Sequence, residues 1–374
     1  MTSSSDYLLR RAGLVLLALF LLFATFSMAG PRSAFLLCIG LGLGLVLEGL
    51  RFGFAGPWRV MVTDRDCRGL LAQFLAIGLA ACFAFPLLAA NPEELSAALA
   101  PVGWSMVAFA FVFGMAMQAV IGCGSGTLVN AGSGNLIALA AMPGFVAGSF
   151  LGSLHLNWWT GLGSLPAYSL QGLFGSGSGL GVTLVGLAIL GGVGIWRAVP
   201  GKRRPPTRLL VAAVLLAGLS ILNLVVAGQA WGVVYGLGLW GTKLASVAGF
   251  DALQTVYWST TANAERLQQS VLTDVTSLTN IGLIAGAFLV MRWRRQADPQ
   301  VGAMTGGSWV AVAIAGLVLG YSARIALGCN VGAFFSGVST GSLHGWAWFI
   351  AAFAGSTLGV RLRPLLIRPL PGQK

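Results

Sequence analysis

The sequence is poor in charged residues, and acids are its scarcest charge. Only 9% of the 374 residues are Asp, Glu, Lys or Arg, with 10 acids against 22 bases. An ordinary soluble domain carries roughly 25%. So little charge excludes a soluble enzyme, and a hydrophobic content of 56% excludes a disordered chain.

Several chemistry-bearing patterns are also missing. The five Cys form no C-x-x-C pair and no small-domain disulfide spacing, and the two His complete no cluster with metal-ligand spacing. The chain has no nucleotide-binding G-x-x-x-x-G-K-S loop. We therefore expect no metal, no cofactor, no enzymatic activity and no ATP-driven transport by this chain alone.

Long apolar blocks are abundant instead. A helix needs about 20 apolar residues to cross a membrane, and these blocks lack the alternation of a β-barrel strand. We expect an all-α polytopic membrane protein, a single transmembrane domain over residues 1–374 with about 9–11 membrane segments. The first block is too long for a signal peptide and is read as a transmembrane helix. The nearly charge-free blocks are 12–29, 69–90, 180–196, 209–227 and 276–291.

The net charge of +12 lies mainly at the ends of these blocks. This is the distribution of cytoplasmic loops under the positive-inside rule, so lipids rather than nucleic acid are the expected partner. The basic joint 197–208 is predicted to be a cytoplasmic linker. The segment GLFGSGSGLG, residues 172–181, reads as a flexible external loop.

The chain contains an internal repeat. GMAMQAVIGCGSGTLVNA, from Gly114, aligns with GYSARIALGCNVGAFFSG, from Gly320, and AGSFLG at 147–152 aligns with AGSTLG at 354–359. Each copy reads as an apolar helix, a Gly-Cys break, a short polar stretch and a second apolar helix. Interrupted apolar segments at matching places in two halves indicate a transporter site.

The charges that flank the copies predict their orientation. Acids precede the first copy, whereas Arg residues precede and follow the second. We therefore expect two inverted halves, 34–160 and 228–362, each with a broken or re-entrant helix. Residues 228–270 are expected to add short or re-entrant helices.

Cys123 and Cys329 are the leading functional candidates, because a thiol is a weak, polarizable donor that can contact a soft anion and release it. Tight packing of two small residues is the alternative. Arg324 could attract an anion, or it could form a structural ion pair with Glu48, Asp251 or Asp274. The residues expected to line a path are Gly122, Cys123, Gly124, Gly126, Gly328, Cys329, Asn330 and Gly332, with Arg324, its counterpart Gln118, and Arg51 and Gly53 at a further break.

At these motifs the chain resembles the YeeE/YedE family of sulphur-transport membrane proteins, over about residues 36–362. The carrying segments are RFGFAGPWRVM from Arg51, GCGSGTL from Gly122 and GCNVGAFFSG from Gly328, and ARIALGCNVGAFFSGVSTGSLHGW is most like the YedE branch. The resemblance implies a multi-pass protein of the bacterial inner membrane that moves a small sulfur-containing anion, with a TusA-type sulfur-carrier protein as a possible partner.

The resemblance also implies that Cys123 and Cys329 guide thiosulfate by S–H···S contacts. Gly53 stands where such members have a third Cys, and Val60 stands where they have an acid. Cys38, Cys67 or Cys82 could replace the lost thiol. The resulting hypothesis is a permease for thiosulfate. The alternatives are a transporter of a selenium compound or another sulfur species, a membrane sulfurtransferase that forms a Cys persulfide, and a sensor without flux.

Overall fold

The computed structural model describes residues 4–294 and 304–367, which are mostly helical. Nine helical segments of this part are long and apolar enough to span a membrane, which confirms the expected all-α polytopic class. All five apolar blocks found in the sequence lie in these segments. The chain is a multi-pass membrane protein.

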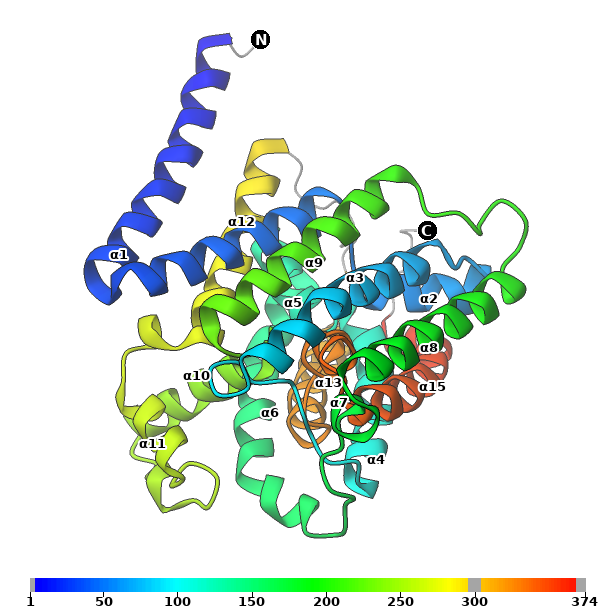
Figure 1. Ribbon diagram of the computed structural model, residues 1–374. Helices are drawn as coiled ribbons and strands as arrows, with labels where there is room; N and C mark the ends of the chain where they lie inside the picture. Colours follow the sequence, from blue (N-terminus) through cyan, green and yellow to red (C-terminus); the bar gives the residue numbers. More distant parts are fainter. Residues whose placement is uncertain (1–3, 295–303, 368–374) are drawn as a thin grey trace.

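Figure 1 shows how these helices are arranged. The long helices are α1 (Ser4–Gly49), α3 (Arg68–Ala90), α4 (Trp104–Val120), α6 (Leu136–Thr160), α8 (Ser176–Arg197), α9 (Thr207–Ala227), α12 (Val275–Arg294), α13 (Gly306–Ile325) and α15 (Leu343–Leu366). The short ones are α2 (Ala55–Asp64), α5 (Gly124–Gly132), α7 (Leu170–Phe174), α10 (Val234–Val247), α11 (Thr261–Gln268) and α14 (Gly337–Ser339), with the single turns η1 (Ala252–Gln254) and η2 (Val271–Thr273) and the π-helical η3 (Asn330–Ser336).

The first helix is bent into two arms. Gly30 adopts a φ of 83°, which only glycine reaches without strain, and Pro31 begins the second arm. The expected first span, residues 12–29, forms the first arm, which projects away from the other helices in Figure 1. The second arm packs on α12, where Gly40 and Gly44 bring the two backbones together.

The helices of each Gly-Cys copy pack on helices of the other copy. Helix α4 of the first copy packs on α15 of the second, and α13 of the second packs on α6 of the first. A Cβ atom at Gly114 would overlap the Ala352 carbonyl, and one at its repeat partner Gly320 would overlap the Phe145 carbonyl. Equivalent glycines therefore make equivalent contacts in the two interfaces.

The matched segments AGSFLG and AGSTLG also bring helices of the two copies close together. A Cβ at Gly148 would overlap the backbone of Leu317, and one at Gly355 would overlap the backbone of Phe111. Small residues on facing helices allow such close approach in membrane proteins, where van der Waals packing drives association. The repeat thus interlocks its two copies, while the half boundaries and the membrane orientation stay predictions.

Two loop expectations have different outcomes. The stretch 228–270 forms the short helices α10 and α11 and the turn η1, as expected. The predicted external loop 172–181 is wrong, because it is almost wholly helical. Gly175, with a φ of 80°, separates α7 from α8. The Gly and Ser residues that follow it, from Ser176, form the first turns of α8.

The glycine contacts predict opposite effects for two substitutions of the same type. Gly114→Ala should destabilise the protein by about 1–3 kcal/mol, because its methyl group has no room beside Ala352. Gly218→Ala, on the outward face of α9 with no atom near its Cβ position, should be neutral or stabilising by up to about 1 kcal/mol. Thermal unfolding of the purified protein measures both. Equal melting temperatures for the two variants would contradict this packing.

Candidate functional site

The first helix of each copy ends with the same backbone conformation. Ile121 directly follows α4, and Leu327 lies two residues after the end of α13. Both residues have a left-handed φ of 60°. This conformation is an outlier for bulky residues, β-branched ones above all, and must be held by its surroundings. The Gly-Cys pairs follow directly, at positions 122–123 and 328–329.

The glycines of these pairs allow the chain to fold back tightly. A Cβ at Gly122 would lie 2.8 Å from the Thr127 nitrogen, and one at Gly328 would lie 2.7 Å from the Ala333 nitrogen. The backbone then enters α5 in the first copy and η3 in the second. Cys123 caps α5, since its sulfur accepts a hydrogen bond from the Gly126 N–H at 3.4 Å. π-Helical turns such as η3 are frequent at functional sites.

The two breaks meet in the centre of the protein. Cys123 and Cys329 are both fully buried. Gly124 of the first break touches the second, because a Cβ there would lie 2.7 Å from the Cys329 sulfur. Asn330, the residue after that Cys, is also fully buried, and neither atom of its amide has a partner among the described residues. A buried amide without partners beside two thiols is suited to contact a solute.

A cavity of about 310 Å³ opens on one side of this centre. We call it the basic vestibule, after Arg51 and Arg59 in its wall. The first copy contributes Gly122, Gly126 and Asn130 to the lining. Gly53 lines the same cavity, and no atom lies within 4 Å of the position that a Cβ would take there. The position at which the family resemblance implies a third thiol is therefore open space.

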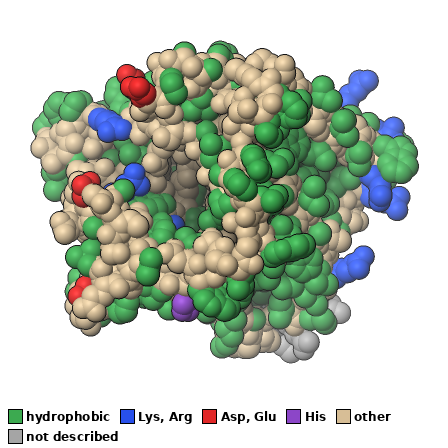
Figure 2. All heavy atoms as spheres, turned by 60° about the horizontal axis from the view of Figure 1, so that its bottom comes forward, with side chains coloured by type: hydrophobic (Ala, Val, Ile, Leu, Met, Phe, Trp, Pro, Cys, Tyr) green, Lys and Arg blue, Asp and Glu red, His purple; other side chains and the backbone are tan. Residues whose placement is uncertain are grey.

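A second cavity, of about 380 Å³, lies on the other side. We call it the aromatic vestibule; it is lined by Trp231, Tyr235, Tyr257, Arg324, Gly328 and Gly332, among others. Gly328 and Gly332 are the repeat partners of Gly122 and Gly126, so equivalent glycines line the two cavities. Figure 2 shows a hollow in the end of the molecule that faces the reader, with basic side chains at its edge and within it.

The course of α9 places the vestibules at opposite ends of the protein. Arg208 at its start lines a further cavity, of about 360 Å³, that is shared with Arg51 and Gly53. Ala230, just beyond its end, lines the aromatic vestibule. The helix has 21 residues and is therefore about 30 Å long, the thickness of the hydrocarbon layer.

Arg324 lies in the wall of the aromatic vestibule. Its side chain donates a hydrogen bond from Nη1 to the Tyr257 hydroxyl at 3.2 Å. The alternative of a structural ion pair is not met in the described residues, where Glu48 pairs with Arg51 at 3.0 Å. Asp251 and Asp274 accept backbone hydrogen bonds at the starts of η1 and α12.

Gln118, the counterpart of Arg324, is not among the residues that line either vestibule. Its amide donates hydrogen bonds to Ser356 Oγ at 2.8 Å and to the Ala55 carbonyl at 3.4 Å. The side chain therefore joins α4 to α15 and α2. Packing between the copies takes up the hydrogen bonds of this amide, and its expected place on the path stays a prediction.

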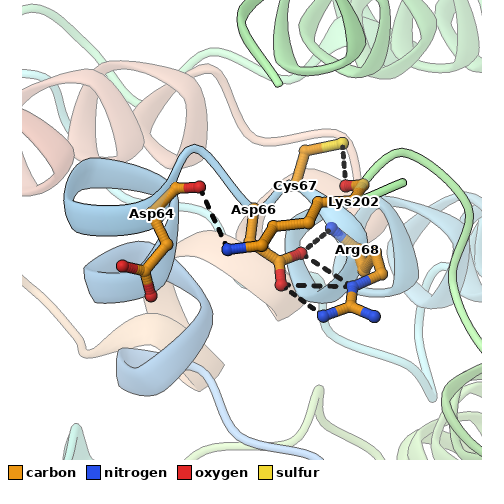
Figure 3. Close-up of polar contacts among 5 residues, drawn as sticks. All are labelled: Asp64, Asp66, Cys67, Arg68 and Lys202. Atoms are coloured by element: carbon orange, nitrogen blue, oxygen red, sulfur yellow. Dashed lines mark hydrogen bonds and ion pairs between the residues drawn. The ribbon is translucent and has the colours of Figure 1, made fainter. Parts of the chain in front are cut away.

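No Cys of the described residues is among those that line either vestibule, and Cys38, Cys67 and Cys82 lie outside the two Gly-Cys breaks. Cys38 and Cys82 are exposed on outer helix faces, and Cys82 lines a lateral apolar groove between α3 and α8. Cys67 is buried beside the 197–208 joint, where its thiol donates to the Lys202 carbonyl at 3.4 Å (Figure 3). Burial raises the pKa of this thiol. The structure thus gives none of them the place of the missing third thiol.

The loop around Cys67 ties the joint to the start of α3. Arg68 binds both carboxylate oxygens of Asp66, at 2.6 Å for the closest pair, and this hydrogen bonding holds the pKa of Asp66 below its usual value (Figure 3). Lys202 donates from Nζ to the Asp64 carbonyl at 3.4 Å. Asp66 and Arg68 form part of the wall of the cavity that Arg51 and Gly53 also line.

The fold and the site define a class: a polytopic helical membrane protein whose two broken helices meet between two opposed cavities. The family described as sulphur transport matches residues 50–358, a range that holds both breaks. The chain belongs to this sulphur transport family, which confirms the family resemblance found in the sequence.

Named relatives fall into two groups. The chain is 31% identical over 167 residues to the "Probable transporter YedE" of Escherichia coli, and 31% over 165 residues to that of Salmonella typhimurium. Each match spans 43–44% of this chain and 40% of the relative, so under half of either YedE protein is covered. It is 25% identical over 341 residues to the "Thiosulfate transporter TsuA" of Spirochaeta thermophila, covering 83% of this chain and 92% of that protein.

Sequence reasoning missed the residues that surround Arg324. Tyr235 and Tyr257 lie in the non-repeated stretch between the copies, and both rings lie near its guanidinium group. Gly238 leaves the space that Arg324 Nη2 occupies. An available signal was the placement of a Gly and aromatic residues in a stretch that lies outside the repeated segments.

The open space at Gly53 predicts selective thiol labelling. In a background without Cys38, Cys67 and Cys82, a charged, membrane-impermeant methanethiosulfonate should modify Gly53→Cys, because the new thiol lies in the basic vestibule. The background itself should resist, since Cys123 and Cys329 are fully buried.

Gly218→Cys, on the outward face of α9, is the matched control and should react slowly with the charged reagent. Mass spectrometry of the intact protein gives the labelled fractions. Equal labelling at positions 53 and 218 would show that the vestibule is not open to water.

Proposed function

We propose that this protein is a permease of the bacterial inner membrane for a small inorganic sulfur anion, first of all thiosulfate. The observation that carries the proposal is the meeting of two Gly-Cys breaks between two cavities at opposite ends of the protein. Membership in the sulphur transport family and the name of the TsuA relative support it. The proposal includes the inverted orientation of the two copies.

The thiols are proposed to recognise the sulfur of the anion. A thiol is a weak donor and a weak acceptor, so each S–H···S contact holds the anion only loosely. Cys123 and Cys329 come from different copies and stand at the narrowest part of the path. Weak contacts at successive sites allow an anion to enter and still to leave, as conduction requires.

The backbone and the charges complete the proposed path. At the breaks, glycine backbones let a solute approach closely, and the unpartnered Asn330 amide offers a donor beside Cys329. Arg324 contributes positive potential in the aromatic vestibule, and Arg59 does so in the basic one, where Glu48 pairs with Arg51. An anion thus passes from one positive region to the other through an uncharged, thiol-lined constriction.

The proposal also assigns one vestibule to the cytoplasmic side of the membrane. The basic vestibule is proposed to face the cytoplasm, because the positive-inside rule assigns the basic ends to that side. A TusA-type sulfur-carrier protein is proposed as a recipient there. The persulfide alternative would require a thiolate activated by a neighbouring cation. In the described residues no cation is hydrogen-bonded to the Cys123 or Cys329 thiol, which favours passage over transfer chemistry.

Removal of the thiols should slow thiosulfate uptake. One hydrogen bond contributes about 1 kcal/mol net, so Cys123→Ala and Cys329→Ala should each lower uptake about fivefold, and the double variant about 25-fold if they act independently. Uptake of radiolabelled thiosulfate into cells without other thiosulfate carriers, at equal protein level, measures this.

Cys82→Ala is the matched control, because this thiol lies on an outer helix face. Competition among thiosulfate, sulfite, sulfide and selenite ranks the substrates in the same assay. Undiminished uptake in the Cys123→Ala/Cys329→Ala variant would end the thiol path.

A further inference from the structure

Arg324 keeps unused hydrogen-bond donors in a buried position. The residue is only 7% exposed, and its Nε and Nη2 have no partner among the described residues. Its one side-chain hydrogen bond in the described residues, from Nη1 to Tyr257, is to a neutral group. A buried guanidinium with two unpartnered nitrogens is costly to keep in the absence of an anion.

The surroundings of Arg324 add a second cation beside the same aromatic ring. Its guanidinium carbon lies 5.6 Å from the centre of the Tyr235 ring and 5.3 Å from that of Tyr257. Arg266 of α11 lies 5.0 Å from the same Tyr235 ring. In the described residues neither Arg324 nor Arg266 belongs to an ion pair, since those found join Arg51 to Glu48 and Arg68 to Asp66.

Glycines hold the guanidinium group in place. A Cβ at Gly152 would lie 2.8 Å from Arg324 Cβ, and a Cβ at Gly238 would overlap Nη2. These contacts come from α6 and α10, which pack against each other. The direction of the side chain is therefore fixed by the two helices and does not need a carboxylate partner.

The cavity beside this group has the chemistry of an oxyanion site. A guanidinium presents its N–H groups as a planar fork, which fits two oxygens of one anion. Trp231, in the same wall, has a buried indole N–H without a partner among the described residues. The aromatic walls lower the local dielectric, which strengthens attraction between the cation and an entering anion.

We propose that the aromatic vestibule contains a discrete binding subsite for a small dianionic oxyanion, in which Arg324 binds the oxygen atoms of the anion. The subsite recognises charge and oxygen, whereas the thiols recognise sulfur. Its place on a transport path rests on the proposed function, but its binding of an anion does not. Sulfate, which has the same charge and a fourth oxygen in place of the sulfane sulfur, should therefore bind here and compete with thiosulfate.

Direct binding to the purified full-length protein tests the subsite. Isothermal titration calorimetry with sulfate and with thiosulfate should give a dissociation constant about tenfold or more higher for Arg324→Gln than for the unchanged protein, because charge-assisted hydrogen bonds are lost. Arg324→Lys should be intermediate, since it keeps the charge but loses the fork. Arg197→Gln, which removes the same charge from an exposed helix end, should leave binding unchanged.

Two further variants separate this subsite from folding and from the thiol path. Gly238→Ala keeps every charge but displaces the guanidinium, and it should also weaken sulfate binding. Arg324→Gln should melt at or above the temperature of the unchanged protein, because no ion pair is lost. Absence of sulfate binding in the unchanged protein, or equal binding in Arg324→Gln, would overturn the proposal.

The Cys123→Ala/Cys329→Ala variant distinguishes the two proposals. It should bind sulfate normally, because the subsite does not use the thiols. If this variant loses sulfate binding while it remains folded, the separate subsite is wrong. If it binds sulfate and also transports thiosulfate at the full rate, the thiol path is wrong and the subsite stands.

Discussion

A helix that breaks inside the membrane frees backbone N–H and C=O groups that water does not reach. Each such group must find a partner, or it costs several kcal/mol in hydrocarbon. This protein satisfies them with nearby side chains and tight turns. Asn130 donates to the carbonyl of Ile121 at 3.1 Å, Thr127 donates to that of Cys123 at 2.8 Å, and the Gly328 N–H reaches the Ala323 carbonyl at 2.9 Å. Irregular backbone is stable here because protein surrounds it.

The rest of the structure follows from the need to bury two such breaks together. Each copy packs its helices on those of the other, through glycines at matching positions such as Gly148 and Gly355. This exchange brings both Gly-Cys pairs to one centre and leaves a vestibule at each end. The ends differ chemically, because in the described residues Arg324 forms no ion pair in one wall, while its counterpart Gln118 is used in packing.

The sequence was informative where a pattern had a single physical meaning. Apolar blocks predicted the spans, and the repeat around Cys123 and Cys329 predicted that two breaks are equivalent. It was less informative where the outcome depends on tertiary contacts. No local pattern shows that Ile121 takes a left-handed conformation, or that the Gly-rich residues after Gly175 continue as a helix. The environment of Arg324 was hidden for the same reason, because Tyr257 reaches it from 67 residues away.

The central claim is that the sulfur of the transported anion passes between two thiols supplied by the two copies. A structure of the purified protein determined with thiosulfate tests it most directly. The account predicts density for the anion at the constriction, with its terminal sulfur in contact with the Cys123 or Cys329 thiol and its oxygens toward a vestibule. Thiosulfate bound only elsewhere, for instance in the lateral groove between α3 and α8, with the space between the thiols closed in every state, would contradict the account.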